Sequence, residues 1–106
     1  MRLSSKIRDS LIEALDLVHP AGCDSSLYLF GSRVDDAKKG GDIDLLWILP
    51  ESRQAWAREH LAEIRSHLRW AAGDQKVDLT LATPAQLVTD PFLLSLGDKI
   101  LLKTWP

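Results

Sequence analysis

The sequence has little cysteine, no long apolar run and almost no net charge. Its one cysteine, Cys23, excludes an internal disulfide and fits a reducing compartment. No apolar run approaches the ~18 residues of a membrane span, and the first residues lack the apolar core of a signal peptide. The formal net charge of −2 gives no general attraction for nucleic acid. We therefore expect a cytoplasmic protein without membrane contact, for which nucleic acid is an unfavoured partner.

The size and composition fit one small globular domain. The chain has 106 residues, of which 45% are hydrophobic and 26% charged, as in an ordinary globular protein. It shows no repeat, linker or low-complexity tract, so we expect residues 1–106 to form a single domain. The oligomeric state stays open, self-association included.

The most informative stretch is 30–46, where a Gly-Ser pair follows one apolar run and Asp-Ile-Asp opens another. Gly31 lets the backbone approach a ligand closely, and Ser32 favours a helix start, whose free amides bind phosphate. Asp42 and Asp44 would share one face of a strand, where their carboxylates repel each other. Oxygen ligands suit Mg²⁺, which commonly contacts substrate phosphates as well. The alternative is a simple turn, with Asp42 capping a loop and Asp44 facing water.

Hydrophobic periodicity and turn residues predict the order of elements. The expected elements are a helix from Ser4 or Ser5 to about 18, a strand at 25–30, a helical turn at 32–38, a loop at 38–41, a strand at 43–49, one helix over 52–72, a strand at 77–81 and a short helix opened by Thr83 and Pro84. Residues 90–106 carry no decisive pattern, and 99–103 fit a strand or a helix equally well. This order predicts an α/β (α+β) sandwich, with a small mixed β-sheet flanked by helices.

Asp78 is a charged residue in the middle of an apolar strand, which is costly unless it is paired or coordinated. If that strand lies beside the Asp42–Asp44 strand, the carboxylates form a cluster of three. Two metal ions held there would activate an attacking oxygen and stabilise a leaving pyrophosphate. The alternative is an ion pair from Asp78 to Lys76 or Arg33. Lys76 and Arg33 are themselves open between a phosphate contact and a charge-balancing or solvated role.

Residues 24–81 resemble the minimal nucleotidyltransferases of the DNA polymerase β superfamily, whose signature is Gly-Ser, a spacer, then Asp-apolar-Asp. Asp78 falls where that family carries its third acidic residue. The resemblance is closest to the small antitoxin-like subgroup and implies a polymerase β-like nucleotidyltransferase fold. Its implied catalytic and metal-binding residues are Asp42, Asp44 and Asp78, and its implied nucleotide-binding residues are Gly31, Ser32, Arg33 and Lys76.

The resemblance also implies a reaction and a partner. Such a protein transfers a nucleoside monophosphate, here AMP from ATP with two Mg²⁺ ions, to an acceptor hydroxyl. Members of the subgroup are antitoxins that silence a helical HEPN ribonuclease by AMP transfer to a tyrosine or by direct contact. The alternative is a catalytically silent module that binds nucleotide or blocks the partner; all three carboxylates are present, which favours catalysis. Among the tryptophans, Trp105 is the one we expect to contact a partner.

Overall fold

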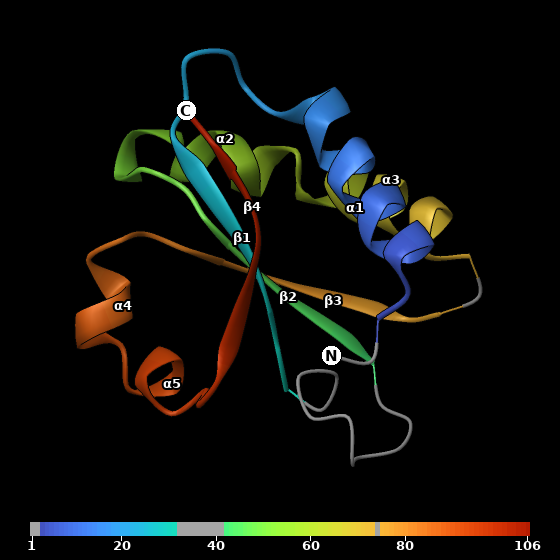
Figure 1. Cartoon of the computed structure of the whole chain (residues 1–106). Coiled ribbons are helices and arrows are strands. Elements are labelled where there is room, and N and C mark those ends of the chain that lie inside the picture. The colour runs from blue at the N-terminus through green and yellow to red at the C-terminus, as the bar shows by residue number, and fades with distance from the viewer. Residues whose placement is uncertain (1–2, 32–41, 74) are drawn as a thin grey trace.

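The computed structural model describes residues 3–31, 42–73 and 75–106, which form five α-helices and one four-stranded sheet (Figure 1). The helices are α1 (Ser5–Val18), α2 (Gln54–Glu59), α3 (Leu61–Ala72), α4 (Gln86–Thr89) and α5 (Pro91–Leu94); the strands are β1 (Ser25–Phe30), β2 (Ile43–Ile48), β3 (Val77–Ala82) and β4 (Lys99–Trp105); and a 3-10 turn, η2 (Glu51–Arg53), precedes α2. The strand order is β3-β2-β1-β4.

The sheet is mixed, which confirms the predicted α+β architecture. Strand β1 pairs antiparallel with both β2 and β4, whereas β2 and β3 run parallel. Parallel neighbours need a crossover connection, and helices α2 and α3 supply it. Strand β4 settles the segment that the sequence left open: it is extended and pairs along β1.

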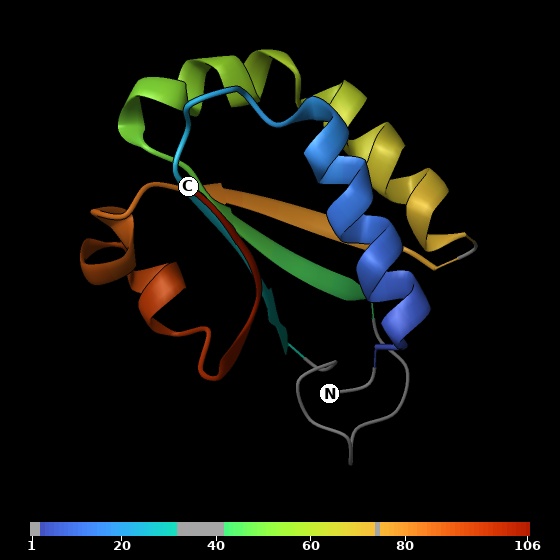
Figure 2. The same ribbon diagram turned by 45° about the horizontal axis from the view of Figure 1, so that its top comes forward.

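The two faces of the sheet are covered unequally. Ile43, Leu45 and Trp47 on β2 belong to the main core, together with buried residues of α1, α2 and α3. Leu46 and Ile48, which alternate with them, belong to a smaller core with Leu93 of α5. Figures 1 and 2 show the three longer helices on one side of the sheet and α4 with α5 on the other. The second face is therefore covered only in part by described residues.

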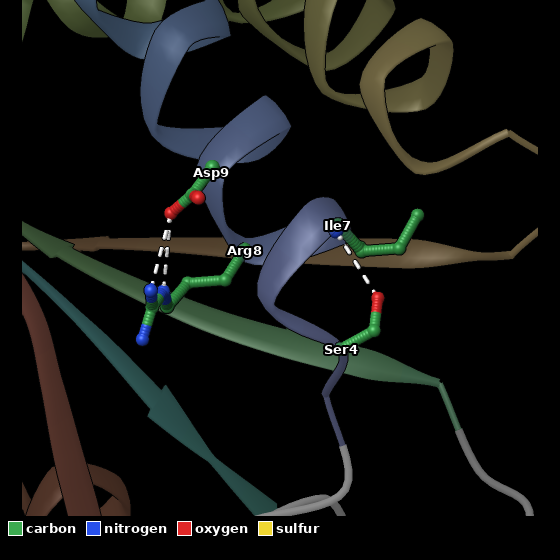
Figure 3. Close-up of polar contacts among 4 residues, drawn as sticks. All are labelled: Ser4, Ile7, Arg8 and Asp9. Atoms are coloured by element: carbon green, nitrogen blue, oxygen red, sulfur yellow. Dashed lines mark hydrogen bonds and ion pairs between the residues drawn. The ribbon is translucent and has the colours of Figure 1, made fainter.

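Helix α1 begins as its sequence predicts. The hydroxyl of Ser4 accepts a hydrogen bond from the backbone N–H of Ile7 at 3.1 Å, as an N-cap residue does (Figure 3). One turn on, the Arg8 guanidinium pairs with the Asp9 carboxylate at 3.3 Å on the exposed side. Leu11 and Leu15 are fully buried, which anchors the helix to the core.

The single helix predicted over 52–72 is wrong in one respect, because it breaks at His60. The backbone there leaves helical geometry, with φ −99° and ψ 10°. The His60 ring stacks on Trp56 with centroids 5.0 Å apart, and its Nδ1 lies 2.8 Å from the Trp56 carbonyl oxygen. The His60 backbone N–H still donates to the same carbonyl at 3.1 Å, so the ring adds a contact at the break without displacing the helical hydrogen bond. The crossover therefore consists of two helices, seen as a curved arc in Figure 2.

Two short helices follow β3, with side-chain hydrogen bonds to the backbone near the start of each. Thr83 and Gln86 cap each other: the Gln86 N–H donates to the Thr83 hydroxyl at 3.2 Å, and the Thr83 N–H donates to the Gln86 amide oxygen at 2.8 Å. Thr83 thus accepts the hydrogen bond expected of a cap, but α4 begins only at Gln86, so the predicted helix start at Thr83 and Pro84 is too early. Asp90 caps α5 by accepting from the Phe92 N–H at 2.9 Å.

The end of the sheet where β1 begins is closed by aromatic side chains. Trp47 is fully buried, and its indole N–H donates to the Ser25 hydroxyl at 3.1 Å. His19 stacks on Trp105 with centroids 5.0 Å apart, and its Nε2 lies 2.8 Å from the same hydroxyl. Trp105 is only 9% exposed and donates to Asp16 at 2.6 Å. The expectation that Trp105 contacts a partner is therefore wrong: it completes the core.

Candidate active site

Two of the predicted carboxylates lie side by side at the start of the parallel strand pair. Asp44 on β2 is directly opposite Asp78 on β3, and Phe30 on β1 is opposite Asp44 on the other side. Residues that are opposite each other in neighbouring strands point to the same face. Asp44 alternates with Leu46 and Ile48, so this is the face with the smaller core. Asp42 precedes β2 by one residue and shares that face. We call Asp42, Asp44 and Asp78 the acidic row.

Within the acidic row, ionisation of Asp44 is disfavoured. Partial burial raises the pKa of Asp44 above its ordinary value, and the negative charges of Asp78 and Asp42 raise it further. Asp78 is exposed, and within the described part of the chain it has no ion-pair partner. The charges of the three carboxylates thus reach one another, and a bound cation would relieve their repulsion.

Gly31 fits closely against the acidic row. Its φ of +77° lies in the region that favours glycine. A Cβ added at this position would collide with the Asp44 carboxylate. The missing side chain therefore lets the Asp44 side chain lie against the end of β1. The Gly31 corner and the Asp44 carboxylate are neighbours, as a shared phosphate and metal site requires.

Lys76 lies over the first carboxylate of the row. Its Nζ is 3.7 Å from an Asp42 oxygen, and the two side chains are 71% and 41% exposed. The Lys76 carbonyl also accepts from the Ile43 N–H at 2.9 Å, which locks the start of β3 to β2. Of the two ion pairs predicted as alternatives for Asp78, the one with Arg33 lies outside the described residues, and the one with Lys76 does not form, because Lys76 pairs with Asp42. Such an exposed pair is weak, so Lys76 could exchange Asp42 for a phosphate, and that role stays a prediction.

Several predicted site residues lie outside the described residues. Ser32 and Arg33 belong to this group, as do the helical turn predicted at 32–38 and the loop predicted at 38–41. Their proposed contacts with a nucleotide remain predictions from the sequence.

The chemistry of the acidic row fits a divalent cation. The row offers carboxylate oxygens, the ligands that Mg²⁺ prefers, and the raised pKa of Asp44 records a repulsion that such an ion would remove. Within residues 3–31, 42–73 and 75–106, however, no three His, Cys, Asp or Glu side chains are arranged to hold an ion. The metal site at Asp42, Asp44 and Asp78 therefore stays a prediction, supported by donor type and charge.

Sequence reasoning missed cations near the row. Lys99, at the start of β4, is opposite Phe30, so the register runs Lys99, Phe30, Asp44, Asp78 across all four strands. Because β4 was not predicted, nothing in the sequence placed Lys99 there. Arg65 and Arg69 of α3 line a cavity that also includes Asp78. The signal for this pair was their four-residue spacing on one helix face.

Comparison with known proteins identifies the family. Residues 5–92 match the nucleotidyltransferase domain family, which covers most of the chain and includes every strand that carries the acidic row. The chain therefore belongs to the nucleotidyltransferase domain family, in agreement with a minimal nucleotidyltransferase of the DNA polymerase β superfamily. Comparisons with curated proteins and with solved structures return no match. None of the described helices has the length and apolar character needed to cross a membrane.

Proposed function

We propose that this nucleotidyltransferase transfers AMP from ATP to a hydroxyl of a partner protein, and that it acts as the antitoxin of a HEPN-type ribonuclease. The observation that carries the chemistry is the register that sets Asp44 opposite Asp78, with Asp42 and Gly31 beside them. Family membership supports nucleotidyl transfer in general. The choice of AMP, of a tyrosine acceptor and of the HEPN partner rests on the resemblance to the antitoxin-like subgroup.

The position of each site residue suggests its role in the transfer. Asp42, Asp44 and Asp78 would hold Mg²⁺, which withdraws charge from the phosphate oxygens and supports the leaving pyrophosphate when bound. The Gly31 corner leaves room for the triphosphate beside Asp44. Lys76 and Lys99 supply positive charge to the phosphates from either side of the row.

The transfer itself needs a base near the acceptor. Asp78 is the exposed member of the row and stands on the edge strand, where an acceptor can approach. It takes the proton of the acceptor hydroxyl as that oxygen attacks the α-phosphorus. The bond from the α-phosphorus to the bridging oxygen breaks, and pyrophosphate leaves. The products are the adenylylated acceptor and pyrophosphate.

The test is to incubate the protein with ATP, Mg²⁺ and its proposed helical HEPN partner, and to measure the partner's mass. We expect a gain of adenylate, lowered about a hundredfold or more by Asp42→Asn, because losing a charged ligand costs several kcal/mol of transition-state stabilisation. The matched control is Asp24→Asn, an exposed carboxylate near the far end of β1. An unchanged partner mass would contradict the proposal.

The same assay separates catalysis from blocking. If Asp44→Asn silences the ribonuclease as well as the unaltered protein does, without modifying it, the chain is a stoichiometric blocker. If the unaltered protein and Asp44→Asn transfer adenylate equally well, Asp44 has no part in the mechanism.

A further inference from the structure

A cavity of about 610 Å³ lies between helix α3 and strand β3. Arg65 and Arg69 line it from α3, and Lys76 and Asp78 line it from the β3 side. Val77 and Leu79 also line this cavity, which we call the α3–β3 groove. Asp78 contributes to the lining of the groove, while its side chain is on the face of the acidic row, opposite the face that α3 covers, so the groove and the row meet at the β3 edge of the sheet.

The arginines of the groove are uncompensated. Arg65 and Arg69 are both exposed and stand four residues apart on one helix face, where like charges destabilise a helix. Among the residues that the structure describes, neither guanidinium has an ion pair or a side-chain hydrogen bond. A helix that keeps two such charges together is suited to an anionic ligand, which would relieve their repulsion.

The wall opposite α3 is the free edge of the sheet. Strand β3 is terminal in the strand order, with β2 as its one neighbour in the described sheet. The carbonyls of Lys76 and Ala82 accept from β2. Backbone groups alternate in direction along a strand, so those of Val77 and Leu79, which line the groove, point away from β2. Such an edge can pair with an extended peptide, a contact that nucleic acid cannot make.

We propose that the α3–β3 groove binds an extended, acidic segment of the acceptor protein and brings its hydroxyl to Asp78. This inference rests on the proposed function, because it names how the acceptor of that reaction reaches the site. The acidic side chains of the segment pair with Arg65 and Arg69, while its backbone pairs with the β3 edge. The indole of Trp70, which is 86% exposed and lines an adjoining cavity with Arg69, packs against an apolar side chain of the segment.

Charge favours a peptide over a nucleic acid in this groove. The chain has a net charge of −2, and the acidic row continues directly from the groove. A nucleic acid strand carries a charge on every nucleotide and would be repelled by the row. An acidic peptide can instead place its carboxylates beside Arg65 and Arg69 and a neutral tyrosine beside Asp78.

The direct test is an NMR titration of the ¹⁵N-labelled chain with a synthetic peptide that has one tyrosine between glutamates. We expect shifts at Arg65, Arg69 and residues 76–79. The Arg65→Glu/Arg69→Glu variant should bind at least about tenfold more weakly, since it replaces attraction by repulsion. The matched control is Arg58→Glu on α2, an exposed arginine outside the groove, which should bind like the unaltered chain. Circular dichroism checks that each variant is folded.

Four results of this titration would overturn the inference. They are equal affinity for the peptide with glutamine in place of glutamate, shifts confined to other residues, tighter binding of a single-stranded oligonucleotide at the groove, and the same shifts with ATP alone. The last two would make the groove a nucleic-acid or a triphosphate site.

Adenylate transfer to the HEPN partner separates this inference from the proposed function. Peptide binding in the groove with no transfer under any condition contradicts the proposed function and leaves the groove assignment intact. Transfer at the same KM in the unaltered chain and in Arg65→Glu/Arg69→Glu contradicts the groove assignment and leaves the proposed function intact. If the proposed function and the groove assignment are both correct, Arg65→Glu/Arg69→Glu should raise the KM for the HEPN partner more than it lowers kcat.

Discussion

At one end of the sheet, the Ser25 hydroxyl lies within hydrogen-bond distance of both Trp47 and His19, and Trp105 donates to Asp16. At the other end, three carboxylates share a face, and burial and mutual repulsion raise the pKa of Asp44. Both ends take polar groups partly out of water. At the aromatic end each polar group has a partner, which stabilises the fold. At the acidic end like charges gather instead, with one weak ion pair from Lys76 to Asp42, an arrangement that disfavours the ionised Asp44 and that a bound cation would relieve.

The largest expected effect concerns Trp47 at the aromatic end. Trp47→Ala should lower the free energy of unfolding by about 3–5 kcal/mol, because a fully buried indole leaves a large cavity. Urea unfolding followed by circular dichroism measures the change. A loss no greater than that of an exposed residue such as Trp70→Ala would show that the aromatic end is not the anchor of the fold.

Ser25→Ala tests the hydrogen bonds of the same end with almost no change in volume. It removes the acceptor of the Trp47 indole and the neighbour of His19, so it should cost about 1–3 kcal/mol. The same unfolding assay measures it, and Ser26→Ala in the next position of β1 is the control. Equal effects of the two substitutions would contradict the assigned network.

Gly31→Ala tests whether the acidic end needs a residue without a side chain beside Asp44. A side chain at φ +77° should cost roughly 1–2 kcal/mol of stability, and its Cβ would also displace the Asp44 carboxylate. We expect adenylate transfer to fall far more than this cost explains. Gly22→Ala has a similar φ and open space around it, so it separates backbone strain from the collision with Asp44. Equal activity of the two variants would remove Gly31 from the site.

Asp44→Asn should have the opposite sign. It abolishes transfer but leaves stability unchanged or slightly higher, because it removes a carboxylate whose ionised form is disfavoured. A clear loss of stability would mean that the ionised Asp44 is a structural residue. Thermal unfolding without Mg²⁺ measures this, with transfer assayed in parallel.

The two ends should also respond to pH in opposite directions. Burial lowers the pKa of His19, with Asp16 acting against it, so protons taken up by the unfolded chain below about pH 6.5 cost stability. The raised pKa of Asp44 makes the folded chain hold a proton that the unfolded chain has released, so stability falls as pH rises between the unfolded and folded pKa values. Unfolding at a series of pH values measures both slopes. His19→Gln should remove the first slope and Asp44→Asn the second; slopes that survive these substitutions would contradict the assignment.

Much of the fold could be predicted because its signals are local. The strand at 25–30 and the Ser4 cap each depend on residues a few positions apart, and both are confirmed. The proximity of Asp44 and Asp78 was conditional on two strands lying side by side, and the parallel register meets that condition.

What could not be predicted depends on distant contacts. Strand β4 has an irregular pattern of exposure and a register shift against β1, so its sequence shows no clean alternation. The sequence suggested Trp105 as a partner contact because its hydrogen-bond acceptor, Asp16, is far away in the chain and could not be anticipated. At the His60 break, the ring and the backbone N–H both lie on the Trp56 carbonyl oxygen, a local arrangement that periodicity does not register.

The parallel pairing of β2 with β3 has a consequence for how activity first appears. Strands β1 and β2 are successive and antiparallel, so they can associate early and already bring Asp42, Asp44 and Gly31 together. Asp78 arrives only after the whole crossover has ordered, because parallel neighbours close a long loop. A molecule in which only β1 and β2 have paired would therefore contain Gly31, Asp42 and Asp44 but lack Asp78, the proposed base, and catalysis would show that β3 has joined the sheet.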